Sequence, residues 1–150
     1  VLEGNLGLRI SYILSLRLSD IVMDGDRYRL EITEQKTKKK RVFTVPLVIQ
    51  QYIENYCLRN GIEKTERIFN LTERAISKQL ALVCDYLGFE GIGTHSFRKW
   101  YATEIYKNNG YDITLVQRLL QHSSAAITQR YIGIEPQRIE EAIEGHAQLL

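Results

Sequence analysis

The sequence predicts a mainly α-helical domain with a small antiparallel β-sheet, an α+β fold. Apolar residues recur at helical spacing through most of the chain, whereas residues 21–45 alternate between apolar and polar side chains. A chain of 150 residues with 44% hydrophobic content is long enough for one domain with a substantial core. We expect six or seven helices and one sheet of two or three strands.

The first helix is short, and its apolar stripe consists of Ile10, Ile13, Leu14 and Leu18. The period then changes to two, because apolar and polar residues alternate over 28–32. A basic turn at 36–41 leads to a second strand at 42–45. This pattern predicts a β-hairpin, and a third short strand is possible near Ile21 and Val22.

The helical period returns at residues 47–60, where Gly61 is a natural stop, and a polar loop follows up to residue 71. Thr72 is the expected N-cap of the next helix, which Gly88 ends. Three more helices are expected, with these candidate N-caps: Thr94, Asp112 or Thr114, and Ser123 or Ser124. A last amphipathic helix is expected beyond Pro136, with Ile139, Ala142, Ile143 and His146 at helical spacing.

A net charge of +2 says little about partners, but two local clusters say more. The basic turn fits either a solvated loop or a phosphate-rich partner, and consists of Lys36, Lys38, Lys39, Lys40 and Arg41. The polar face of the helix after Thr72 fits either solvent or a DNA backbone, and consists of Arg74, Ser77 and Lys78.

Cys57 and Cys84 are too few for a disulfide framework and lack metal-ligand spacing, so we expect buried thiols in a reducing cytoplasm. No apolar run is long enough for a membrane helix, and the first residues do not resemble a signal peptide. Because the chain lacks an initiator Met, we expect it to be a piece of a longer protein.

The stretch 94–131 contains the side chains best suited to catalysis. His95 and Arg98 are three apart, so they share one face of a helix. His122 follows the next helical segment, and Tyr131 comes nine residues later. Together these side chains can hold a phosphate and attack it.

These motifs resemble the tyrosine recombinase (phage integrase) family. The matching features are His-x-x-Arg at 95–98, Leu-Leu-Gln-His-Ser-Ser at 119–124, and Tyr131. The segment Gly-Leu-Arg-Ile-Ser at 7–11 resembles the first arginine box of that family, and Glu-Gln-Lys-Thr at 34–37 resembles its lysine segment. The matches run from about Gly7 to Gly133 in the order typical of the family.

The resemblance implies a tyrosine recombinase catalytic-domain fold and a role for each matched residue. Tyr131 would be the nucleophile that forms a 3′-phosphotyrosine, and Arg9 and Arg98 would bind the nonbridging phosphate oxygens. His95 would assist proton transfer, and His122 would hydrogen-bond a phosphate oxygen. Lys36 would protonate the leaving 5′-oxygen, with Lys38 as the alternative. The chemistry needs no metal, cofactor or ATP.

One residue departs from the family pattern. Many relatives have an acidic residue three positions after the first arginine, where this chain has Tyr12. Either another carboxylate, such as Asp20, supports the site, or the site works without one.

We therefore expect residues 1–150 to be the C-terminal catalytic domain of a site-specific recombinase, an integrase of a mobile element, whose N-terminal core-binding domain is absent. The resemblance implies double-stranded DNA as partner, a homotetramer on DNA, a monomeric free fragment, no membrane association and a cytoplasmic location in a bacterial or phage system. The alternatives are a catalytically vestigial DNA-binding module and a type IB topoisomerase-like enzyme. A helix-turn-helix regulator is disfavoured, because the helices at 113–127 lack a basic recognition face.

Overall fold

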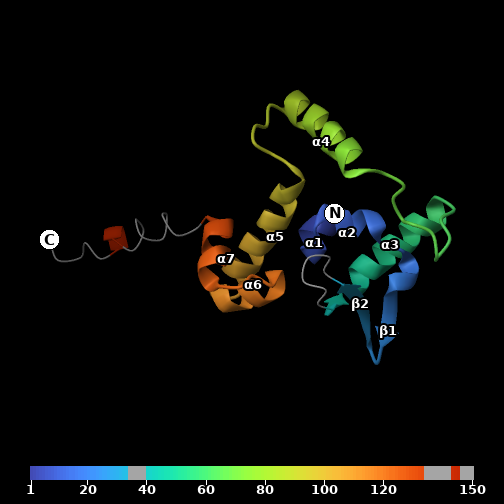
Figure 1. The fold of residues 1–150 in the computed structure, drawn as a ribbon, viewed down its shortest axis with the longest axis horizontal. Helices are drawn as coiled ribbons and strands as arrows, with labels where there is room; N and C mark the ends of the chain where they lie inside the picture. Colours follow the sequence, from blue (N-terminus) through green and yellow to red (C-terminus); the bar gives the residue numbers. More distant parts are fainter. Residues whose placement is uncertain (34–39, 134–142, 146–150) are drawn as a thin grey trace. The chain divides into compact units, whose positions relative to one another are not determined.

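The computed structural model describes residues 1–33, 40–133 and 143–145, which belong to two compact units, 1–98 and 99–150 (Figure 1). The first unit contains α1 (Leu2–Leu6), α2 (Ile10–Ser15), η1 (Leu18–Asp20), β1 (Ile21–Asp24), β2 (Arg27–Thr33), β3 (Lys40–Val45), α3 (Leu47–Arg59) and α4 (Glu73–Leu87). Helix α5 (Thr94–Asn108) begins in the first unit and continues into the second, which also contains α6 (Ile113–Leu120) and α7 (Ala125–Ile132). The predicted mainly helical fold with a small antiparallel sheet is confirmed.

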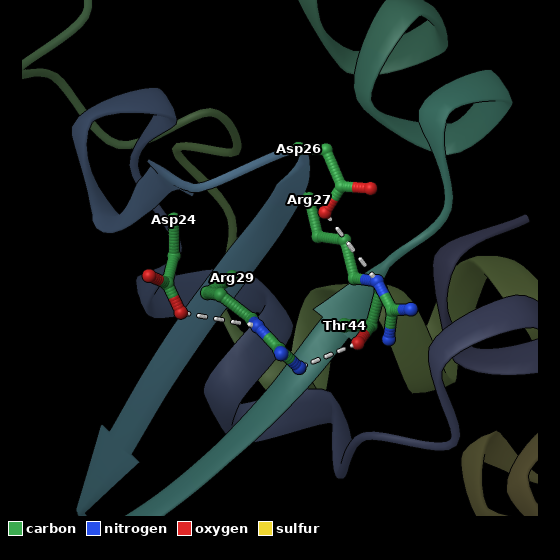
Figure 2. A network of polar contacts seen from close by, with 5 residues as sticks. All are labelled: Asp24, Asp26, Arg27, Arg29 and Thr44. Carbon is green, nitrogen blue, oxygen red and sulfur yellow. Dashed lines mark hydrogen bonds and ion pairs between the residues drawn. The ribbon is translucent and has the colours of Figure 1, made fainter.

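The sheet has the order β1-β2-β3, and both pairs are antiparallel, so the third strand expected near Ile21 is present. Arg29, in the central strand, links the two outer strands (Figure 2). Its Nη1 donates to Thr44 Oγ1 at 2.7 Å, and its Nε lies 3.5 Å from Asp24 Oδ2. These contacts span the sheet on one face and support its register.

The core of the first unit joins the sheet to α1, α2 and α3. Its most deeply buried side chains come from these elements and the linking segments, and include Leu8, Leu30, Val45 and Ile53. Burial of each such side chain contributes roughly 1.5–3 kcal/mol to folding. This packing fixes the segment that contains Arg9.

Helices α5, α6 and α7 surround a smaller core in the second unit, where Ala102, Val116 and Leu120 are almost fully buried. Ile132 joins them from α7, and the partly buried ring of Tyr131 packs against the same cluster. The side chain of Tyr131, the candidate nucleophile, is therefore packed against the core of the second unit.

Most of the predicted helix ends are confirmed. Thr72 and Ser124 accept hydrogen bonds from backbone N–H groups of the first turns of α4 and α7, and Asp112 caps α6 in the same way. The prediction that Thr94 caps α5 is wrong, because the helix already includes Thr94 as its first residue. The hydroxyl of Ser96 in the first turn accepts from the N–H of Gly93, the residue before the helix, at 3.0 Å.

Several sequence predictions concern residues outside the described ranges. They include Lys36, Lys38 and Lys39 of the basic turn and most of the helix expected beyond Pro136. Cys57 and Cys84 are both buried and free, as expected, and burial raises the pKa of the Cys57 thiol. Of the helices in the described ranges, none combines the length and apolar character that crossing a bilayer requires.

Candidate active site

Arg9 occupies the junction between α1 and α2. Gly7 ends α1 in a left-handed conformation with φ of 60°, which turns the chain toward α2 and favours glycine at this position. Arg9 is then the extended N-cap residue of α2, and its carbonyl accepts hydrogen bonds from the N–H groups of Tyr12 and Ile13. The backbone of this half-buried arginine is therefore fixed on both sides.

His95 and Arg98 lie one turn apart near the start of α5, as the spacing predicts. The two residues differ in their exposure to solvent: His95 is exposed, whereas Arg98 is only 4% exposed. A guanidinium stays charged when buried, so the surroundings of Arg98 must compensate its charge.

Glu3 is a carboxylate close enough to Arg98 to interact with its charge. The residue lies in α1 and is 8% exposed, and its Oε1 is buried without a hydrogen-bond partner in the described part of the chain. Glu3 and Phe97, the neighbour of Arg98, line the same cavity of about 260 Å³. Burial raises the pKa of Glu3 from its ordinary value of 4.5 to about 7, although the amino group of Val1 and Arg98 oppose this shift.

The raised pKa of Glu3 predicts that stability depends on pH. Between pH 4.5 and about 7 the folded chain holds the Glu3 proton more tightly than the unfolded chain, so the free energy of unfolding should fall as pH rises through this window. The fall should reach up to about 3 kcal/mol and should be absent in Glu3→Gln. Denaturant unfolding at pH 4 and pH 8 measures it.

The matched control for this prediction is Glu90→Gln, because Glu90 is exposed in the loop before α5. This variant should keep the pH dependence of the unmodified chain. An equal pH dependence in Glu3→Gln and the unmodified chain would contradict the assignment to Glu3.

His122 follows α6 directly, and a tight turn orients it. Gln121 ends the helix in the left-handed conformation with φ of 55°, which is unfavourable for a residue other than glycine. Two hydrogen bonds between Gln117, one turn earlier in the chain, and His122 offset this strain. The Gln117 carbonyl accepts from the His122 N–H at 3.0 Å, and its side-chain amide donates to the His122 carbonyl at 3.2 Å.

The His122 ring contacts α7 at two points. Its Nδ1 lies 3.0 Å from the hydroxyl oxygen of Thr128, and its ring packs edge-on against Tyr131 with 5.3 Å between centroids. The structure thus brings together His122 and Tyr131, which are nine residues apart in sequence. An imidazole beside a phenol can serve a reaction in which the phenol oxygen is the nucleophile.

The candidate DNA-contacting residues that the structure describes are on two elements. Arg74, Ser77 and Lys78 are exposed on one face of α4, as the helical spacing predicts. Lys40 and Arg41 open β3, and Lys40 Nζ lies 2.8 Å from Glu31 Oε1. That hydrogen bond raises the pKa of Lys40, so a DNA phosphate would compete with Glu31 for this ammonium group.

Asp20, the carboxylate named as a substitute for the acid missing at position 12, has another partner. Its Oδ2 accepts a hydrogen bond from the backbone N–H of Arg17 at 2.8 Å, and the residue is exposed. Asp20 therefore stabilises the short η1 helix, whereas Glu3 interacts with the charge of Arg98, a candidate catalytic residue.

Sequence reasoning missed two residues, Glu3 and Thr128. A five-residue helix is too short to show a clear period, so the burial of Glu3 had no sequence signal except its apolar neighbours Leu2 and Leu6. Thr128 had a usable signal, because it precedes Tyr131 by three residues and shares its face of the helix.

This combination of a helical fold, an arginine pair, two histidines and a tyrosine is typical of enzymes that break and rejoin DNA through a tyrosine. The profile of the phage integrase family matches residues 4–138. The chain belongs to the phage integrase family, as a tyrosine recombinase catalytic domain.

Individual relatives agree with this assignment. The chain is 37% identical over 139 residues to the protein named Probable integrase/recombinase YoeC of Bacillus subtilis (strain 168), covering 87% of this chain and 73% of that protein. It is 28% identical to tyrosine recombinase XerA of Pyrococcus furiosus, covering 92% of this chain and 50% of the relative. The chain thus spans about half the length of most of the curated relatives it matches.

Solved structures share the fold. The XerH site-specific recombinase, crystallised with its difH substrate after cleavage, matches with a TM-score of 0.72 at 25% identity, covering 95% of this chain and 43% of that one. The catalytic domain of bacteriophage HP1 integrase matches with a TM-score of 0.63 at 24% identity, and the match covers 98% of this chain and 79% of that one. The structure of the Tn1549 transposon integrase, in complex with circular intermediate DNA, has the same fold, with a TM-score of 0.60.

Proposed function

We propose that this chain cleaves and rejoins DNA strands at specific sites through a covalent bond between Tyr131 and the 3′-phosphate. The observation that carries the proposal is the complete set of candidate residues in a chain of this family: Arg9, Lys36, His95, Arg98, His122 and Tyr131. A tyrosine at the end of a helix, in ring contact with a histidine, supports the role of Tyr131. A vestigial binding module would have no need of this set.

In the proposed step the Tyr131 oxygen attacks phosphorus, and the bond from phosphorus to the 5′-oxygen breaks. The Tyr131 proton leaves with the help of His95, and Lys36, or Lys38 in its place, supplies a proton to the 5′-oxygen. Arg9, Arg98 and His122 stabilise the charge on the nonbridging oxygens. Rejoining is the reverse attack by a 5′-hydroxyl, so the phosphate bond is conserved without ATP.

We further propose double-stranded DNA as the partner and a homotetramer as the active assembly. The DNA complexes of XerH and the Tn1549 integrase support the first point. In this proposal the chain is the C-terminal catalytic domain of a longer protein with an N-terminal core-binding domain, free as a monomer, acting in the cytoplasm of a prokaryotic or phage-infected cell. The basic turn and the polar face of α4 would contact the DNA backbone.

A nicked suicide DNA substrate tests the proposed chemistry. We expect a protein–DNA adduct, stable in denaturing gels, that forms at neutral pH in the presence of a chelator, because no step requires a metal. The suicide substrate can carry a randomised DNA sequence next to the nick, which takes the place of a defined target site. An adduct that forms only after a divalent metal is added would contradict the mechanism.

A further inference from the structure

We infer that Thr128 is a positioning residue whose hydroxyl holds the His122 ring so that its other nitrogen, Nε2, can donate to a DNA phosphate. The inference rests on the proposed function, which assigns His122 to a phosphate oxygen. It adds to that function a residue that neither touches DNA nor reacts.

The contact is buried and short. Thr128 is 0% exposed, and its Oγ1 lies 3.0 Å from His122 Nδ1. The same oxygen lies 3.4 Å from the carbonyl of Ser124, the N-cap residue of α7. A hydroxyl fully removed from water needs such partners, because leaving it unsatisfied costs roughly 1–3 kcal/mol.

The two partners of the hydroxyl suit both charge states of the histidine. When His122 is neutral, Thr128 can donate its proton to Nδ1, which leaves the ring proton on Nε2. When His122 is protonated, Nδ1–H donates to Oγ1, and the hydroxyl proton turns to the Ser124 carbonyl. Nε2 therefore carries a proton that it can donate to a phosphate oxygen in both states.

Thr128 also connects the His122 ring to the helix that carries the nucleophile. Thr128 and Tyr131 lie three residues apart on α7, so they share one face of that helix. His122 contacts both, one through a hydrogen bond and the other through ring packing. The hydroxyl thus sets the position of the phosphate-binding ring relative to the helix that carries the attacking oxygen.

Tyr131 is a titratable residue that packs against the His122 ring. The other histidine and the charged residues on α5, α6 and α7 are His95, Arg98, Lys99, Glu104, Lys107, Arg118 and Arg130. They are unchanged in the variants below, so a change in the His122 ring between Thr128→Val and Thr128→Ser follows from the hydroxyl.

The test compares Thr128→Val, which removes the hydroxyl at nearly constant shape, with Thr128→Ser, which keeps it. In single-turnover cleavage of the suicide substrate, Thr128→Val should be roughly tenfold slower with unchanged DNA affinity, the size expected for one lost hydrogen bond to an ionisable ring. Thr128→Ser should restore the rate. Thr103→Val is the matched control, because Thr103 donates to the Lys99 carbonyl in the same i to i−4 manner on α5.

NMR of the His122 ring nitrogens in the chain without DNA gives a second readout. The Nε2–H tautomer of neutral His122 should lose population in Thr128→Val, because Nδ1 no longer accepts from a hydroxyl, and should regain it in Thr128→Ser. An unchanged tautomer population, or an unchanged cleavage rate in Thr128→Val, would overturn the inference. If the unmodified chain forms no adduct but the tautomer population shifts as expected, the proposed function fails and the link between Thr128 and His122 stands. If Thr128→Val does not fold, Thr128→Ala takes its place.

Discussion

Replacing Tyr131 with phenylalanine should eliminate the covalent protein–DNA adduct while leaving the fold unchanged. Phenylalanine keeps the ring that packs against the second unit's core and against His122, and it loses only the oxygen that attacks phosphorus. A missing nucleophile cannot be replaced by the remaining groups, so the loss should be complete within detection. Denaturing gels of the suicide-substrate reaction measure it, and circular dichroism confirms the fold.

The control for this variant is Tyr86→Phe, which removes a phenol that is 88% exposed on α4. It should form adduct at the rate of the unmodified chain. An adduct that persists in Tyr131→Phe would show that another residue attacks the DNA, and the mechanism proposed above would then be wrong.

Local signals in the sequence predicted most of the fold. Cap residues such as Asp112 and Ser124 stand next to clear apolar periods, so helix starts could be read directly. The cap predicted at Thr94 was wrong, because α5 begins one residue earlier than the pattern indicated and includes Thr94. Choices between neighbouring polar residues depend on backbone geometry, which periodicity does not determine.

The candidate site was predictable where residue spacing decides contact. His95 with Arg98 and Thr128 with Tyr131 are pairs within a single helix, so their shared faces follow from sequence. The interaction of Glu3 with Arg98 joins positions 95 residues apart, and it depends on the tertiary structure of the first unit, which contains both residues. The sequence offered no prediction for Glu3, because a helix of five residues shows no pattern that indicates burial.

Arg98→Lys should reduce the rate of adduct formation by about 100- to 1,000-fold while preserving DNA binding. Lysine keeps a positive charge near the buried carboxylate of Glu3, so the electrostatic balance of this region is retained. It loses the planar fork with which a guanidinium binds two phosphate oxygens at once. Single-turnover rates on the suicide substrate, with DNA affinity measured separately, test this expectation.

Arg59→Lys is the matched control, since Arg59 is an exposed arginine in the last turn of α3. It makes the same chemical change without a buried partner, and its rate should equal that of the unmodified chain. Equal rates for Arg98→Lys and Arg59→Lys would mean that position 98 needs only a positive charge. The contact of a planar fork with two phosphate oxygens, proposed for Arg98, would then be wrong.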